Sequence, residues 1–403
     1  MSSHDFPDFA PKGAGLLGGA TRSRTEHSRD LQQPVSRIGR IPLRAEPTWN
    51  DGRLQTSHGA QLSQGSVSGG GRGPSGGGDS DGLSLRAACG RGDLERPNFN
   101  LNVPEDGYAW WYVDGISHDG SKAISIIGFI GSVFSPWYRW SGRKNPANHC
   151  CLNVVTYGRG GRWTMTDRGE DALDLSDDTL QIGPSSMHWD GDKLIVDINE
   201  ISTPHAQAIR GTVTIRPSAI TGIELPLTED GAHIWRPFGP VSDIEVELNR
   251  SGWDWSGHGY FDANFGTRAL EADFDYWTWG RFPTSKGAAC FYDAARRDGS
   301  ELAAAIRFDK TGQAQAMEAP PKAKISRPFW GVRRETRADG GFQPRQVKAM
   351  LDAPFYNRSA VKTRINGEES IGVHEALDLT RFRKSWLMPM LAVRVPRRKN
   401  WPL

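Results

Sequence analysis

Three titratable side chains alternate in one short segment of the chain, SGHGYFDANFGTR (256–268). His258, Tyr260 and Asp262 stand at every second position, and alternate side chains of a β-strand point to the same face of a sheet. As a strand, this segment would line one surface with an imidazole, a phenol and a carboxyl group. Such a surface is either solvated or part of a site.

Aromatic residues crowd this segment and its neighbours in the sequence. GAHIWRPFGP (231–240) and WDW (253–255) precede it and ADFDYWTWGRF (272–282) follows it; the combined clusters also contain His233, Trp235, Trp253, Trp255, Asp273, Asp275, Tyr276, Trp277 and Trp279. A carboxyl group among so many rings should lose solvation, which raises its pKa. A carboxyl group that stays protonated near neutral pH can act as a general acid.

Protonation of an unactivated alkene is a reaction that suits such a pocket. It creates a carbocation, which Trp and Tyr faces stabilise through cation–π attraction without reacting with it. The reaction needs an acid, an aromatic cage and a positioned water. We therefore expect an enzyme with no cofactor and no metal.

Other kinds of site match the sequence less well. Asp262 and Asn264 resemble the start of a calcium loop, but no Glu stands at the twelfth position. No HExxH motif, nucleotide-binding fingerprint or G-x-S-x-G elbow occurs. The net charge is +2 and the basic residues are scattered except at the C-terminus, which predicts no nucleic-acid partner. The plainer alternative is a structural core, in which the rings pack inside and Asp262 caps a turn.

Short strands are the elements that must position these residues. From residue 96 onward, apolar runs are separated by Gly, Asn, Asp and Pro; examples are YAWWYV (108–113), AISIIGFI (123–130), CLNVVTY (151–157), KLIVDIN (193–199), GTVTIRP (211–217), DIEVELN (243–249) and AAAIRFD (303–309). The pattern predicts an all-β protein of antiparallel barrels. The length favours two of them, a first β-barrel domain over 96–230 and a second over 231–403.

The first 95 residues have a different composition, rich in Gly, Ser, Arg and Gln. Such a segment buries too little apolar surface to offset its chain entropy, so we expect residues 1–95 to be disordered. No apolar run reaches the length of a transmembrane helix, and the N-terminus lacks the apolar region of a secretory signal. Four cysteines without a C-x-x-C pair indicate a reduced, cytoplasmic protein.

The segments HIWRPFGP and WSGHGYFDANFGTRALEADFDYWTWGRF resemble the carotenoid 1,2-hydratases, or hydroxyneurosporene synthases, of photosynthetic bacteria. So do ERPNFNLNVPEDGYAWWYVDGISHDGSKAISIIGFIGSVFSPWYRW, KNPANHCCLNVVTYG and WTMTDRG, so that the resemblance covers residues 95–400. It implies a lipocalin-like pair of barrels. It also implies addition of water, without a cofactor, across the terminal C1–C2 double bond of an acyclic carotenoid such as neurosporene or lycopene. The product is a tertiary alcohol.

The family's suggested active-site residues correspond to the catalytic candidates His233, Trp235, Tyr260 and Asp262. In the implied mechanism, neutral Asp262 protonates C2 and leaves a tertiary cation at C1 that faces Trp235 and Tyr260. A water oriented by His233 or by the Asp262 carboxylate then attacks C1. For substrate binding we expect His258, Trp255, Tyr276 and Trp277.

A hydrocarbon substrate has to come from a membrane, and the C-terminal sequence suits one. Residues 381–403 contain no acid; apolar Trp386, Leu387, Met388, Met390, Leu391 and Trp401 accompany the basic Arg381, Arg383, Lys384, Arg394, Arg397, Arg398 and Lys399. Each basic residue near anionic lipid contributes about 1 kcal/mol, and Trp prefers the interface. We expect peripheral binding to the inner or photosynthetic membrane. The alternative is a final strand with a solvated basic tail.

Two other functions are compatible with the sequence. A non-catalytic lipocalin-like carrier would bind carotenoids or other lipids and form no hydroxylated product. A related enzyme would use the same pocket for another cation or pericyclic reaction on a polyene or polyketide.

Overall fold

The structure is a computed structural model that describes residues 48–50, 53–55 and 96–398, all within one compact unit. Most of the segment predicted to be disordered, 1–95, lies outside the described residues. Within it, β1 (Thr48–Asn50) and β2 (Arg53–Gln55) pair as an antiparallel hairpin, which the prediction of disorder did not include.

The larger of two main sheets has 14 described strands in the order β25-β7-β5-β4-β3-β15-β14-β12-β11-β10-β9-β8, with β6 beside β5 and β13 beside β14. Its strands are β3 (Tyr108–Ser117), β4 (Ala123–Ile130), β5 (Cys150–Tyr157), β6 (Arg162–Thr164), β7 (Asp167–Arg168), β8 (Leu173–Leu175), β9 (Thr179–Ile182), β10 (Ser185–Trp189), β11 (Leu194–Ile201), β12 (Ala208–Pro217), β13 (Leu225–Pro226), β14 (His233–Leu248), β15 (Asp254–Gly266) and β25 (Arg397–Arg398). Pairing is antiparallel except between β25 and β7.

The smaller sheet has seven described strands in the order β19-β18-β17-β16-β24-β23-β22. They are β16 (Phe274–Thr284), β17 (Gly287–Arg296), β18 (Glu301–Asp309), β19 (Ala314–Ala316), β22 (Arg345–Asp352), β23 (Tyr356–Ile365) and β24 (Glu368–Asp378). A separate hairpin pairs β20 (Lys322–Ile325) with β21 (Arg334–Arg337). The described helical segments are short: α2 (Pro136–Trp140), η1 (Pro146–Asn148), η2 (Glu170–Ala172), α3 (Leu270–Asp273), α4 (Leu379–Phe382) and α5 (Leu387–Arg394).

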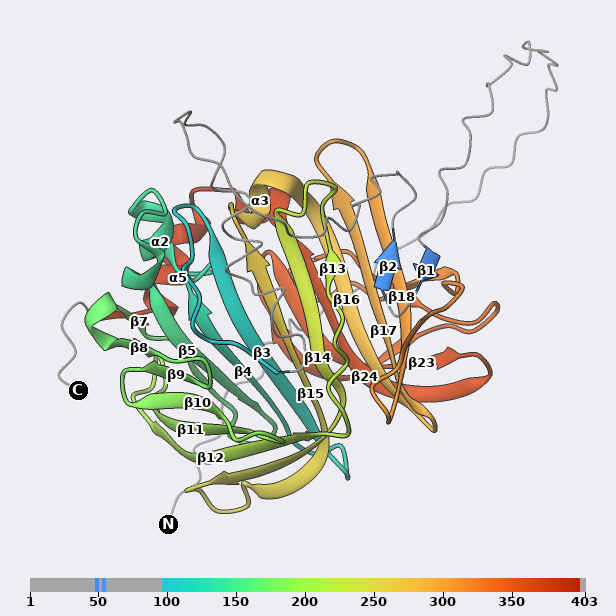
Figure 1. The fold of residues 1–403 in the computed structure, drawn as a ribbon, viewed down its shortest axis with the longest axis horizontal. Helices are drawn as coiled ribbons and strands as arrows, with labels where there is room; N and C mark the ends of the chain where they lie inside the picture. Colours follow the sequence, from blue (N-terminus) through green and yellow to red (C-terminus); the bar gives the residue numbers. More distant parts are fainter. Residues whose placement is uncertain (1–47, 51–52, 56–95, 399–403) are drawn as a thin grey trace, which may run out of the picture. The chain divides into compact units, whose positions relative to one another are not determined.

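The central strand β3 explains how the two sheets are held together. Its sequence YAWWYV is buried on both faces, so its alternate side chains enter two different cores. Trp111 and Val113 pack with β9–β12 of the larger sheet. Trp110 and Tyr112 pack on the opposite face, against residues of the smaller sheet. Figure 1 shows β3, β14 and β15 beside the orange and red strands of the smaller sheet.

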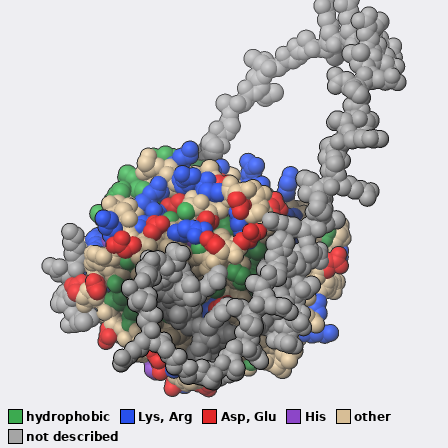
Figure 2. Space-filling view, turned by 45° about the horizontal axis from the view of Figure 1, so that its top comes forward, with side chains coloured by type: hydrophobic (Ala, Val, Ile, Leu, Met, Phe, Trp, Pro, Cys, Tyr) green, Lys and Arg blue, Asp and Glu red, His purple; other side chains and the backbone are tan. Residues whose placement is uncertain are grey.

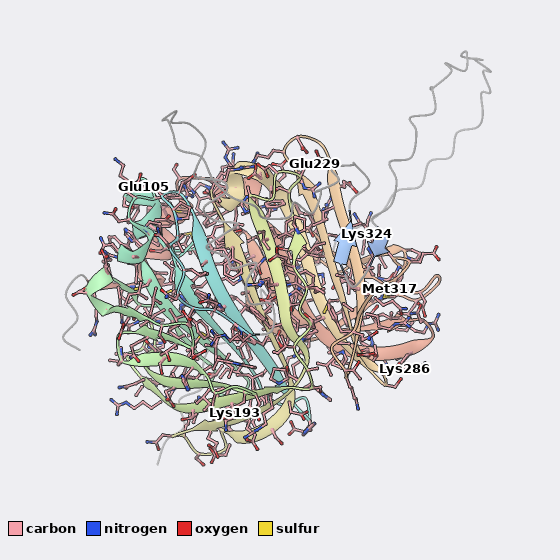
Figure 3. All side chains as sticks on the ribbon, viewed as in Figure 1. Glu105, Lys193, Glu229, Lys286, Met317 and Lys324 are labelled. Carbon is pink, nitrogen blue, oxygen red and sulfur yellow. The ribbon has the colours of Figure 1, made fainter. Side chains whose placement is uncertain are left out.

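Many of the charged residues lie at the turns and on the outside of this arrangement. Lys193, before β11, and Lys286, between β16 and β17, stand at hairpin turns in Figure 3. Figure 2 shows Lys and Arg interspersed with Asp and Glu on the face in view. No helix among the described residues is long and apolar enough to cross a membrane.

The antiparallel all-β prediction is confirmed, with two differences in detail. The described strands form open sheets, because the first and last strands of each order are not paired with each other; they contain no closed barrel. The predicted domain boundary between 230 and 231 also differs from the change of sheet. β14 and β15 follow that boundary but lie in the larger sheet, and β16 is the first strand of the smaller one.

Candidate active site

Asp262 lies between the two sheets, on the face of β15 that packs against the smaller sheet. It is opposite Tyr112 in the register of β15 and β3, and only 4% of its surface is exposed. The residues two positions away, Tyr260 and Asn264, are buried on the same face. The neighbouring Phe261 and Ala263 point into the other core.

The two oxygens of the Asp262 carboxyl group have different surroundings. Trp235 Nε1 and the Tyr260 hydroxyl both donate hydrogen bonds to Oδ2, each at 2.7 Å. Oδ1 is buried and has no hydrogen-bond partner among the described residues. Because Oδ2 accepts two hydrogen bonds, the proton of a neutral carboxyl group belongs on Oδ1.

The environment of Asp262 keeps that proton bound near neutral pH. Burial raises the pKa of Asp262 to about 8, against the opposing effect of the hydrogen bonds from Tyr260 and Trp235. The negative charges of Glu375 and Asp114 raise this pKa further. Asp262 therefore has the properties of a general acid.

Asp262 lines an inner cavity of about 70 Å³ between the sheets. The larger sheet and its helix connection contribute Trp110, Tyr112, Ile127, Phe129, Phe134, Asp262 and Asn264, and the smaller sheet contributes Trp277, Trp279, Tyr292, Tyr356, Glu375 and Leu377. Most of these residues are aromatic or aliphatic, so the carboxyl group faces rings rather than solvent.

An apolar chamber of about 400 Å³ adjoins the inner cavity. The two share Tyr112, Ile127, Phe134 and Tyr356 as lining residues. The far wall of the chamber includes Trp330, residues 351–355 and, from α5 and the residue after it, Leu387, Met390, Leu391, Arg394 and Val395. Trp330 and Met390 are also partly exposed, at 40% and 42%, which places them at the mouth of the chamber.

A buried network of charges lies beside Tyr112. Arg281 Nε donates to Asp114 Oδ1 at 2.8 Å, and Arg358 Nη2 donates to Asp114 Oδ2 at 3.2 Å. Arg358 also pairs with Glu375. The Tyr112 hydroxyl lies 2.6 Å from Asp114 Oδ2 and 3.3 Å from Glu375 Oε1. The network thus links strands of both sheets and holds Glu375 at the wall of the inner cavity.

His233 is placed differently from its predicted neighbours. Its Nδ1 is 2.8 Å from the Tyr108 hydroxyl and its Nε2 is 2.7 Å from Asp273 Oδ2. Burial lowers the pKa of His233, against the opposing effect of Asp273. His233 lines neither cavity. The structure joins Trp235, Tyr260 and Asp262 by hydrogen bonds and does not join His233 to them.

The predicted substrate-binding residues lie in four different surroundings. Trp277 is buried and lines the inner cavity. His258 is exposed near the other end of β15, with its ring edge against His118. Trp255 packs against the core on the opposite face of β15. The Tyr276 hydroxyl donates to the Arg333 carbonyl at 2.6 Å, and this ring lines neither cavity.

Several residues of the site were not identified from the sequence. Trp110 and Tyr112 alternate in YAWWYV, a signal for one shared face, but their position opposite Asp262 depends on long-range register. Glu375 lies in GVHEALD, which has no feature that distinguishes it from other strands.

In the described part of the chain, no group of three His, Cys, Asp or Glu side chains is placed to hold a metal ion.

Comparisons with known proteins agree with the resemblance noted in the sequence. The family model described as "Carotenoid hydratase CrtC" matches residues 126–403. The acyclic carotenoid 1,2-hydratase of Cereibacter sphaeroides is 61% identical over 277 residues, which cover 68% of this chain and 99% of that protein. That of Rhodobacter capsulatus is 54% identical over 278 residues, 68% of this chain and 99% of the relative. That of Thiocapsa roseopersicina is 39% identical over 393 residues, 96% and 97% of the two chains.

Proposed function

The chain belongs to the carotenoid hydratase family, and from this premise we propose that it adds water across the terminal C1–C2 double bond of acyclic carotenoids such as neurosporene and lycopene. One observation carries the proposal: a carboxyl group with a raised pKa faces an aromatic cavity that adjoins an apolar chamber. Alkene protonation requires both an acid and an apolar chamber that can hold the hydrocarbon. A non-catalytic carrier would need the chamber but not the acid.

The proposed reaction begins with proton transfer from Asp262 Oδ1 to C2. A C–H bond forms, the π bond breaks, and the positive charge is left on tertiary C1. Trp110, Trp277, Trp279 and Tyr292 surround this position and stabilise the cation through their ring faces. Water then bonds to C1 through oxygen and gives one proton to the Asp262 carboxylate, which restores the acid.

Trp235 and Tyr260 act in this proposal behind the acid rather than on the cation. They line neither cavity, and both donate to Oδ2 of Asp262. Donors in this position stabilise the carboxylate that forms when Asp262 loses its proton. His233 has a positioning role, because its bonds to Tyr108 and Asp273 fix the first residue of β14.

The direct test is incubation of the purified chain with lycopene, without oxygen or added cofactor. We expect mass spectrometry of the extracted pigment to find the gain of one water, or of two if both ends react. A folded protein that binds lycopene and yields no such gain would favour the carrier.

The pH dependence of the reaction follows from Asp262. The group is active when protonated, so the rate should fall as the pH rises through about 8. Tyr260→Phe removes a hydrogen bond that favours the charged form, so the pKa should rise and the alkaline limb should move to higher pH. Initial rates across neutral and alkaline pH measure this shift. Tyr276→Phe is the matched control, because its hydroxyl bonds to Arg333 away from both cavities. An identical shift in the two variants would contradict the assignment.

We also propose that the protein works in the cytoplasm at a membrane surface and takes its substrate from the bilayer. The C-terminal segment is folded against the rest of the protein: Leu387, Met388 and Val395 are buried, and β25 pairs with β7. Trp386, Met390 and Val393 of the same segment are exposed, at 54%, 42% and 69%. α5 therefore presents one side to the chamber and apolar side chains to the outside, with Arg383, Lys384 and Arg394 exposed nearby.

Membrane binding should depend on these exposed side chains. Replacing both Trp386 and Val393 with Ser should reduce co-flotation with vesicles containing anionic phospholipid by at least about tenfold, since burying one large apolar side chain is worth about 1.5–3 kcal/mol. High salt should reduce it as well. Ile371→Ser, at a position of β24 that is 50% exposed, is the control. Unchanged flotation of the double variant would favour the solvated tail.

A further inference from the structure

Buried polar atoms other than those of the Asp262 carboxyl group also line the inner cavity. In the described part of the chain, Trp279 Nε1 and Asp262 Oδ1 are buried without a hydrogen-bond partner, and Asn264 Nδ2 has none beyond the contact of its side chain with Tyr292. All three residues line the cavity, and each is at least nine-tenths buried. Buried polar groups in folded proteins are nearly always paired with protein, water or ligand atoms. A small polar molecule in the cavity would provide the partners that these atoms lack.

The cavity has the size and the polar partners that a water molecule needs. Its volume of about 70 Å³ exceeds the roughly 10–15 Å³ that one water requires, and a stable buried water makes two to four hydrogen bonds. The larger sheet offers Asn264 Nδ2 as a donor. The smaller sheet offers Glu375 as an acceptor, from a position opposite Trp279 in the pairing of β24 and β16.

We propose that Asn264 and Glu375 hold the nucleophilic water of the hydration reaction in the inner cavity, between Asp262 and the cation. The inference rests on the proposed function. It gives the water a place that His233 does not provide, since that ring is engaged with Tyr108 and Asp273.

Each hydrogen of the water then has a defined partner. Asn264 Nδ2 donates to the water oxygen and leaves a lone pair for C1. One O–H of the water is directed to Glu375, and that hydrogen stays on the product hydroxyl. The other O–H is directed to Asp262 Oδ1. As the C1–O bond forms, this O–H bond breaks and its proton moves to Oδ1, which restores the acid. The network with Arg358 and Tyr112 fixes Glu375 for this role.

Loss of the water site should separate protonation from hydration. If the cation forms but no water is in place, the Asp262 carboxylate takes a hydrogen back from C2 and regenerates the alkene. In D₂O, Asp262 delivers a deuteron to C2. Rotation about the C1–C2 single bond of the cation then brings the original C2 hydrogen to the carboxylate, and its removal leaves deuterium at C2. We therefore expect Asn264→Leu to form about 10²-fold less 1-hydroxy product, the size of effect that misplacing a reactant produces, while recovered lycopene gains deuterium at C2.

The experiment measures product and deuterium content together for the full-length chain in D₂O. Asn199→Leu is the control, because Asn199 is exposed on β11, its amide oxygen accepts from Arg210 Nε at 2.9 Å, and it lines neither cavity; it should not change the ratio of exchange to hydration. Glu375→Gln and Asn264→Ser serve as second variants if Asn264→Leu does not fold. Hydration and exchange that fall in parallel, or hydration that is unchanged, would overturn the water site. Absence of both reactions in the unaltered protein would instead overturn the proposed function.

Discussion

Replacing Asp262 with Asn should reduce the rate of carotenoid hydration by about 10²–10⁴-fold, the usual contribution of a general acid. The amide has nearly the same shape as a neutral carboxyl group, and its oxygen can still accept from Trp235 and Tyr260. The fold should therefore be kept. What is lost is the acidic proton on the side of the carboxyl group that faces the cavity. Product formation from lycopene, followed by chromatography and mass spectrometry, measures the effect, with circular dichroism as a check on folding.

Asp254→Asn is the matched control for this experiment. Asp254 lies on the same strand, β15, but is exposed near its start. Its replacement should leave the rate unchanged. Deuterium exchange into lycopene should also disappear in Asp262→Asn, since no proton reaches C2. A folded Asp262→Asn protein with the unaltered rate would remove Asp262 from the mechanism.

Replacing Arg281 with Met should lower the free energy of unfolding by about 3–5 kcal/mol, because it leaves a buried charge without one of its partners. Asp114 is 0% exposed and Arg281 is 1% exposed. Only Arg358 and Tyr112 would remain within hydrogen-bond distance of the Asp114 carboxylate in the described structure. Urea titration followed by tryptophan fluorescence measures the change.

A surface ion pair provides the comparison for this stability effect. Arg216 and Glu245 are 2.6 Å apart, but their side chains are 48% and 56% exposed. Arg216→Met should therefore cost less than about 1 kcal/mol. The double variant Asp114→Leu, Arg281→Met should recover part of the loss, because an apolar pair leaves no uncompensated charge. Equal losses in the buried and exposed variants would show that the network contributes little to stability.

The sequence predicted the local parts of this molecule better than its long-range pairing. Alternation in GHGYFDANF placed Tyr260 and Asp262 correctly on one face, because that period is a property of the strand itself. The alternation could not show that His258, on the same face, lies in the first part of β15, where side chains are exposed. The same alternation places Trp255 on the opposite face of β15, where it packs against the other core.

The site also depends on strands that are distant in sequence. Two irregularities interrupt the pairing of β14 with β15, between Arg236 and Ser242, and such bulges cannot be read from composition. The placement of Glu375, Trp279 and Tyr292 opposite Asp262 depends on how the two sheets pack. For the same reason the basic C-terminal segment was predicted as a tail or membrane contact, and its place in the chamber wall was not foreseen.

The wall that α5 provides has a consequence for the order of events during synthesis. Residues 387–395 leave the ribosome after all the other residues that line the chamber. Until then Phe355, which lines the chamber and is buried in the finished protein, is without the wall that α5 provides, and the apolar chamber is open to any apolar surface. A nascent chain arrested just before residue 387 should therefore be prone to aggregation and should depend on chaperones, although it already contains every residue of the inner cavity.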